Sequence, residues 1–138
     1  MQVENEVMPT SEERLTEMMA PGPDGPIYMV NLLEFHEAAD YADGRETDLT
    51  GRQAYDLYKE GLAEVLSQFG AEVVFEGDVT FLFIGQVEEL WDAVAVVRYP
   101  DRGTLLEMSA SPQFAEVAVH REAGLAGQLN IETVDPIG

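Results

Sequence analysis

Cysteine is absent from the 138-residue chain, and so are long apolar runs. Without cysteine there is no disulfide, no thiolate nucleophile and no cysteine-bound metal, so the fold must depend on packing. No run approaches the roughly 18 apolar residues that a membrane-spanning helix needs. The first ten residues, MQVENEVMPT, carry neither the basic nor the apolar region of a signal peptide. We therefore expect a cytoplasmic protein without a membrane span.

Positive charge is also scarce. The chain has six arginines and one lysine, Lys59, against 27 acidic residues, which gives a formal net charge of −20. A surface this acidic repels phosphate backbones and anionic membranes, so we expect neither nucleic acid nor a membrane as a partner. It would suit a saline habitat, in which self-repulsion is screened.

The common catalytic and nucleotide-binding motifs are missing. There is no G-x-S-x-G, no P-loop, no dinucleotide fingerprint and no Ser-His-Asp arrangement. His36, Glu37 and Asp40 lie close together in sequence, but their spacing and loop setting do not fit a zinc motif. We therefore expect no metal and no cofactor.

The pattern of apolar residues and capping signals predicts an α+β domain. A helix should begin at Thr50, whose capping box includes Gln53, and should end at Gly70. The other predicted elements are strands over 27–35, 72–87, 92–99 and 129–134, and helices over 101–108 and 111–124. This βαββαβ order is typical of a ferredoxin-like fold with a four-stranded antiparallel sheet and helices on one face.

The N-terminal residues look like an addition to this domain. Thr10 and Glu13 form a second capping box, and Pro21-Gly22-Pro23 ends the short helix that follows it. We therefore divide the chain into an N-terminal helical extension, residues 1–26, and a ferredoxin-like domain, residues 27–138. The glycines at positions 22, 25, 44, 51, 61 and 70 are assigned to turns and helix ends.

Two predicted strands are apolar on both sides. In the first strand Ile27 and Met29 alternate with Tyr28 and Val30, and the run 93–97 is also apolar throughout. A sheet with helices on one face would leave the second apolar face in water. A partner subunit is the simplest cover, so we expect a homodimer or a higher homo-oligomer.

Three runs together resemble a known family. They are PIYMVNLLEF, GQVEELWDAVAVVRYPDR and SPQFAEVAVHREAG, and the similarity covers roughly residues 26–134. The family is the one called domain of unknown function 1330. The resemblance implies a ferredoxin-like fold that pairs into a dimeric α+β barrel. The family has no agreed activity, and the wider superfamily contains cofactor-free oxygenases, isomerases, cyclases and haem-degrading enzymes as well as proteins that only bind.

Three polar side chains are candidates for ligand binding. Asn31 places an amide inside an apolar strand, where a ligand or a neighbouring group must satisfy its hydrogen bonds. Arg98 and Arg121 could each clamp a carboxylate with two parallel hydrogen bonds. The alternative for both arginines is a salt bridge with one of the many acids, and the alternative for Asn31 is a structural role.

Two further residues complete the candidate set. His120 is the best candidate for a general acid or base, although a lone histidine on a helix more often has no such role. Trp91 would either line a ligand cleft or close the end of the sheet. For Tyr55 and Tyr58 we expect core packing with the hydroxyl at the edge.

Two functions remain open, and with them the question of whether the protein is an enzyme. The first is a small-molecule-binding protein or cofactor-independent enzyme, whose cleft between sheet and helices is lined by Asn31, Trp91, Arg98 and Arg121. Its ligand would be anionic or carbonyl-bearing. The second is a non-catalytic structural dimer. A cleft of at least about 300 Å³ that contains Asn31 and an arginine would favour the first.

Overall fold

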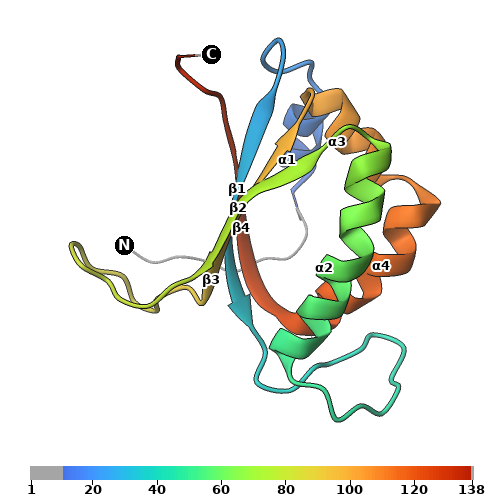
Figure 1. Cartoon of the computed structure of the whole chain (residues 1–138), viewed down its shortest axis with the longest axis vertical. Coiled ribbons are helices and arrows are strands. Elements are labelled where there is room, and N and C mark those ends of the chain that lie inside the picture. Colours follow the sequence, from blue (N-terminus) through green and yellow to red (C-terminus); the bar gives the residue numbers. More distant parts are fainter. Residues whose placement is uncertain (1–10, 138) are drawn as a thin grey trace.

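The order of helices and strands agrees with the predicted βαββαβ order (Figure 1). The computed structural model describes residues 11–137. A short N-terminal helix, α1, precedes the repeating unit. The elements are α1 (Glu12–Met18), β1 (Ile27–Phe35), α2 (Gly51–Gln68), β2 (Glu72–Asp78), β3 (Ala93–Tyr99), α3 (Arg102–Ser109), α4 (Pro112–Gly124) and β4 (Leu125–Thr133).

The four strands form one sheet in the order β2-β3-β1-β4, with every neighbouring pair antiparallel. The two central strands, β1 and β3, are the ones whose sequences are apolar on both sides. Helices α2 and α4 lie side by side over one face of the sheet (Figure 1). This arrangement is the ferredoxin-like fold that the sequence predicts.

Polar caps fix the helix starts at the predicted residues. The Thr50 hydroxyl accepts a hydrogen bond from the Gln53 amide at 3.0 Å, and the Gln53 side chain accepts one from the Thr50 amide at 2.9 Å. Asp101 caps α3, and Ser111 caps α4 with Pro112 in its first turn. Each cap satisfies a backbone donor that the helix leaves free.

Two predicted strand boundaries are wrong. The strand expected over 72–87 ends at Asp78, because β2 is an edge strand and its pairing with β3 ends where Asp78 meets Ala93. The last strand begins at Leu125 rather than Leu129, directly after α4, and pairs with β1 from Phe35 onward. Its first residues are too small and polar to show the alternation of a strand.

The core fills the space between the sheet and α2. Alternate β1 residues, Ile27, Met29 and Leu33, point toward the helices and are buried. The apolar stripe of α2 is buried in the same interior, which confirms the core packing expected for Tyr55 and Tyr58. Its core members are Ala54, Tyr55, Tyr58, Leu62, Val65 and Leu66.

Glycines allow α2 and α4 to approach closely. A Cβ atom on Gly61 would lie 2.3 Å from a methyl carbon of Val117 in α4, and one on Gly51 would lie 2.8 Å from the carbonyl oxygen of Gly124 in α4 and 2.1 Å from that of His36. Side-chain carbons cannot approach other atoms this closely, so both positions require glycine. The assignment of Gly61 to a turn or helix end is therefore wrong, because it lies within α2 at a contact between helices.

The opposite face of the sheet is apolar, and no described helix covers it. The apolar residues of this open face are Tyr28, Val30, Leu32, Phe75, Val94, Val96, Leu129 and Ile131, and its charged residues are Glu34, Glu72 and Arg98. Phe75 is 59% exposed and Ile131 is 45% exposed. The uncovered apolar face agrees with the expectation from the sequence.

Helix α1 is attached to the domain through Arg102. The Arg102 guanidinium donates to the backbone carbonyls of Glu17 and Ala20 at 3.3 and 3.1 Å and pairs with Glu132 at 2.7 Å. Ser11 caps the helix by accepting from the Arg14 amide at 3.1 Å. The capping box expected at Thr10 lies outside the described residues. No helix within residues 11–137 combines the length and apolarity needed to cross a bilayer.

Candidate functional site

Asn31 lies on the helix-facing side of β1, and other residues satisfy its amide. Its oxygen accepts hydrogen bonds from the Gln128 and Asn130 side chains at 2.7 and 2.8 Å. Its nitrogen donates to the backbone carbonyls of Met29 and Ala95, both at 3.2 Å. Asn31 therefore needs no ligand to satisfy it, and it holds Gln128 in place.

Gln128 connects Asn31 to Arg121. The Arg121 guanidinium, on the last turn of α4, donates to the Gln128 side-chain oxygen. Gln128 is only 7% exposed, as is Asn31. Asn31 and Arg121, two of the candidates from the sequence, thus belong to one chain of hydrogen bonds. Gln128 itself was missed, because the strand was expected to begin one residue after it.

Three buried tyrosines lie in the same interior. Tyr55 and Tyr58 come from α2 with ring centroids 5.3 Å apart, and Tyr99 is the last residue of β3. Their exposed fractions are 8%, 7% and 6%. Sequence reasoning missed Tyr99, although its position two residues after the inward-facing Val97 is the signal that places it on this face.

The hydroxyl groups of these tyrosines border open space. Within residues 11–137, no protein group forms a hydrogen bond with these hydroxyls. Yet no fully buried side-chain oxygen or nitrogen in the described part of the chain lacks a partner. Each hydroxyl oxygen must therefore face space that water can enter.

The tyrosines remain protonated at neutral pH. Burial raises the pKa of Tyr58 to about 12 and also raises the pKa values of Tyr55 and Tyr99. The positive charge of Arg121 lowers the pKa of all three and offsets only part of the effect of burial. The interior therefore holds three neutral O–H donors, and the charge of Arg121 acts on all three.

A cleft of about 200 Å³ lies between α2 and the strands β2 and β3. Tyr55 borders the cleft and links it to the tyrosine cluster. The residues around it are Leu33, Phe35, Arg52, Tyr55, Lys59, Glu76, Gly77, Asp78, Ala93, Val94 and Ala95. The cleft is smaller than expected, and it is lined by Arg52 rather than by Asn31 or Arg121. The lining predicted from the sequence stays a prediction.

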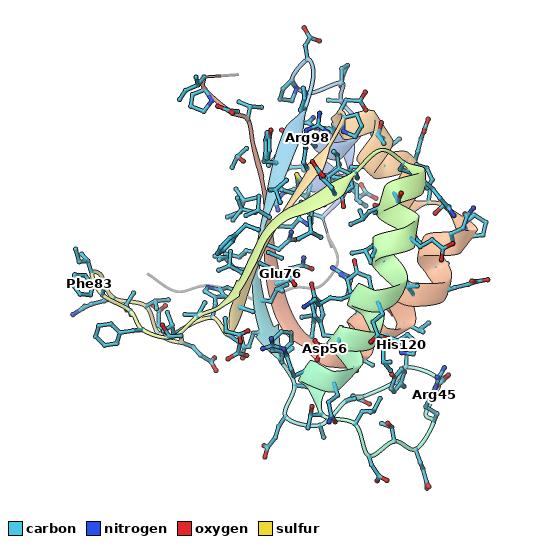
Figure 2. All side chains as sticks on the ribbon, in the orientation of Figure 1. Arg45, Asp56, Glu76, Phe83, Arg98 and His120 are labelled. Carbon is cyan, nitrogen blue, oxygen red and sulfur yellow. The ribbon has the colours of Figure 1, made fainter. Side chains whose placement is uncertain are left out.

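Two ion pairs cross the mouth of the cleft from α2 to β2. Arg52 pairs with Asp78 at 2.7 Å, and Lys59 pairs with Glu76 at 3.3 Å. Figure 2 shows Glu76 on the side of the sheet that faces α2. All four side chains are between 35% and 62% exposed, so these pairs add little stability.

Arg98 and Trp91 lie away from this interior. Arg98 is paired in register with Tyr28 and Glu72, one position out of phase with the inward-facing Val97, so its side chain belongs to the open face. A shared cleft for Arg98 and Asn31 is thus wrong. Trp91 is partly buried in the segment before β3 and does not border the cleft.

His120 contacts the loop between β1 and α2. Its Nδ1 lies 2.7 Å from the hydroxyl of Tyr41, and the two rings meet edge to face with centroids 5.5 Å apart. The Arg45 guanidinium stacks over the Tyr41 ring at 4.5 Å, and Figure 2 shows Arg45 and His120 at the same end of the molecule. His120 therefore fixes this loop. No group of three potential metal ligands occurs within residues 11–137.

Comparisons with known proteins agree with the fold. Residues 41–132 match the family described as domain of unknown function 1330. The chain is 30% identical to a protein of unknown function from Rhodopseudomonas palustris, with coverage of 96% of this chain and 100% of that one and a TM-score of 0.83.

More distant structures share only the fold. A dabb family protein with a ferredoxin-like fold from Mesorhizobium loti is 11% identical, with coverage of 81% and 98% and a TM-score of 0.52. A dimeric protein of unknown function from Bacteroides fragilis, also with a ferredoxin-like fold, is 7% identical, with coverage of 80% and 96% and a TM-score of 0.52. No curated protein matches the chain.

Proposed function

The chain belongs to the family described as domain of unknown function 1330, and we propose that it binds a small organic anion or carbonyl compound between the sheet and helices α2 and α4. The observation that carries this proposal is the set of three buried tyrosines whose hydroxyls bind no protein group within residues 11–137, together with Arg121, whose positive charge lowers the pKa of each. A packed interior built for stability alone would pair such hydroxyls with protein acceptors.

The chemistry of the cluster favours a ligand that accepts hydrogen bonds. Neutral tyrosine hydroxyls and a guanidinium donate to carboxylate, enolate or carbonyl oxygens, and hydrogen bonds to a charged acceptor are the stronger kind. The net charge of −20 repels anions at long range. Binding would therefore depend on these local donors.

The walls of the cleft add an apolar requirement. Leu33, Phe35 and Ala93 border it, together with the ring of Tyr55. Its volume of about 200 Å³ is below that of a site for a drug-sized ligand. A single aromatic ring or a short aliphatic chain that bears one carboxylate or ketone fits this description.

Calorimetric titration and thermal shift with benzoate, phenylacetate and small ketones test the proposal. Tyr58→Phe, Tyr99→Phe and Arg121→Gln should each weaken binding about tenfold, since a lost hydrogen bond costs about 1.4 kcal/mol. Tyr28→Phe and Arg98→Gln are matched controls on the open face and should bind as the parent does. Equal affinity in all five variants would place the site elsewhere. A parent that binds none of the compounds would favour the non-catalytic dimer.

A second candidate function is cofactor-independent enolisation in the same cleft, favoured by the position of Glu76. Glu76 borders the cleft together with Tyr55, and its negative charge contributes to the raised pKa of Tyr55. Glu76 would take a proton from the carbon beside a ligand carbonyl. The C–H electron pair would form a C=C bond while the oxygen, now an enolate, accepts a hydrogen bond from Tyr55, which lines the same cleft. Return of the proton to another carbon would complete an isomerisation.

Deuterium exchange measured by NMR tests this second candidate. A bound ketone should exchange its α-protons with D₂O in the presence of the parent protein. Glu76→Gln should abolish the exchange without abolishing binding. Asp56→Asn, which alters an acid on α2 that does not line the cleft, should leave the exchange rate unchanged. Exchange that persists in Glu76→Gln would exclude Glu76 as the base.

The open face of the sheet supports a homodimer. An apolar face of this extent is characteristic of an interface between subunits, and a structural neighbour is described as dimeric. We therefore propose that two copies pack through their open faces in an isologous interface. Sedimentation at micromolar concentration should give twice the mass of the chain, 15.2 kDa. A monomer at all concentrations would contradict it.

A further inference from the structure

The segment between β2 and β3 projects from the molecule as an arm. Residues 79–92 leave the sheet after Asp78 and return at Ala93 (Figure 1). Figure 2 shows Phe83 at the far end of this arm. The exposed fractions of Phe81, Phe83 and Ile84 are 73%, 84% and 85%, so the tip places three large apolar side chains in contact with water.

The composition of the arm differs from that of the rest of the chain. Residues 79–87, VTFLFIGQV, contain no charged residue, although a quarter of the chain is charged. The rings of Phe81 and Phe83 meet edge to face with centroids 6.2 Å apart, so the tip is a defined apolar surface. Exposed apolar surface of this kind marks a contact with another molecule.

The arm projects on the side of the sheet that α2 and α4 do not cover (Figure 1). The open face lies on this same side, since its residues are out of phase with the buried residues of β1. The C-terminal end of the chain adds further exposed apolar residues, Val134 and Ile137. A molecule that packs on the open face would therefore meet the arm as well.

The charge of the chain bears on which molecule packs on the open face and the arm. At long range two copies with a formal charge of −20 each repel one another, but residues 79–87 carry no charge and the open face carries few, so a contact there sets few acids of one copy against acids of the other. An anionic membrane surface would repel the chain. We propose that residues 79–87 form a dimerisation arm that packs against a second copy of the chain. This proposal rests on the homodimer proposed above.

The absence of cysteine provides a clean test, because a single introduced thiol can be followed in the full chain. The maleimide reaction rate of Phe83→Cys should fall at least tenfold as protein concentration rises from below to above the dimer dissociation constant. Glu116→Cys, an exposed position on α4 in the helical layer, should react at the same rate throughout. Protection that does not depend on concentration would show the arm folding onto its own chain. A rate that never falls would show that a second copy does not cover it. Either result overturns the proposal.

Sedimentation of Phe81→Ser/Phe83→Ser supplies an independent measurement. The double variant should raise the dimer dissociation constant at least tenfold and keep the melting temperature of the monomer, because both side chains lie outside the core. Leu15→Ser/Met19→Ser removes exposed apolar residues from α1 and its C-cap and should leave the constant unchanged. If the parent dimerises and the double variant does not weaken the dimer, the proposal of a dimerisation arm is wrong and that of a homodimer is kept. A parent that never dimerises would overturn both.

Discussion

At the scale of single residues, glycine has two different roles in the helices. Gly61 in α2 faces Val117 of α4, and an added Cβ would lie 2.3 Å from its methyl carbon. Gly103 in α3 has only ordinary contact, since the nearest atom would be a carboxylate oxygen of Asp101 at 3.5 Å. The same substitution should therefore have opposite effects at the two positions.

Gly61→Ala should reduce the free energy of unfolding by about 1–3 kcal/mol, because the added methyl group forces α2 and α4 apart. Gly103→Ala should raise it by about 0.5–1 kcal/mol, because alanine loses less backbone freedom on folding. Urea denaturation measures both values. Adding Val117→Ala to Gly61→Ala should restore part of the loss. If Gly61→Ala left the free energy of unfolding unchanged, the two helices would be able to move apart without loss of stability.

The buried tyrosines predict how stability depends on pH. The pKa of Tyr58 rises from 10.0 to about 12 on folding, because burial disfavours the phenolate. Above pH 10 the unfolded chain therefore loses this proton while the folded chain keeps it, so stability falls as pH rises toward 12. The free energy of unfolding should be constant below pH 10 with respect to this group. It should then decline between pH 10 and 12.

Tyr58→Phe isolates this contribution. Its free energy of unfolding should decline less than that of the parent between pH 10 and pH 12 when measured by urea denaturation. Tyr28→Phe removes a tyrosine from the open face without changing the cluster and should decline as much as the parent. Equal slopes for Tyr58→Phe and the parent would show that folding does not raise the pKa of Tyr58.

At the scale of helices and strands, the sequence predicted the helix starts, which depend on local interactions, better than the strand ends, which depend on pairing. The caps at Thr50, Asp101 and Ser111 could be identified because each acts within four residues of sequence. The extent of β2 could not, since the run after Asp78 has strand-forming residues but no neighbouring strand within the described chain to pair with. The start of β4 depended in the same way on pairing with β1.

These boundaries also explain what was missed in the candidate site. Asn31 and Arg121 could be singled out, because an amide in an apolar strand and an arginine late in a helix are visible in sequence. Their connection runs through Gln128, which became recognisable only once β4 was known to begin at Leu125. Arg98 was grouped with them although its phase in β3 places it on the other face.

The buried stripe of α2 gives a prediction at this scale. Leu62 and Leu66 are 7% and 2% exposed, whereas Leu57 on the same helix is 39% exposed. Leu62→Ala and Leu66→Ala should each destabilise the fold by about 2–5 kcal/mol through lost burial and the cavity that remains. Leu57→Ala should change stability by less than about 0.5 kcal/mol. Equal losses at all three positions, measured by urea denaturation, would contradict the assignment of the buried stripe.

At the scale of the whole molecule, charge and apolar surface are separated. The acidic side chains give the chain its net charge of −20, whereas the open face and the arm present few charges. Association through these regions must overcome repulsion between two like-charged copies. Dissolved salt screens that repulsion and leaves the contact between apolar surfaces in place. The change of the dimer dissociation constant with salt concentration therefore shows whether apolar contact or charge pairs stabilise the dimer.

Raising sodium chloride from about 0.1 M to about 1 M shortens the Debye length from about 10 Å to about 3 Å, so the dimer dissociation constant should fall. Sedimentation velocity over a concentration series measures it. Phe75→Ser on the open face should weaken the dimer at every salt concentration without changing the direction of the trend, because this side chain contributes apolar area and no charge. A constant that rises with salt would instead indicate an interface held by charge pairs, such as one between Arg98 and Glu72 of two copies. That outcome would contradict an apolar dimer interface.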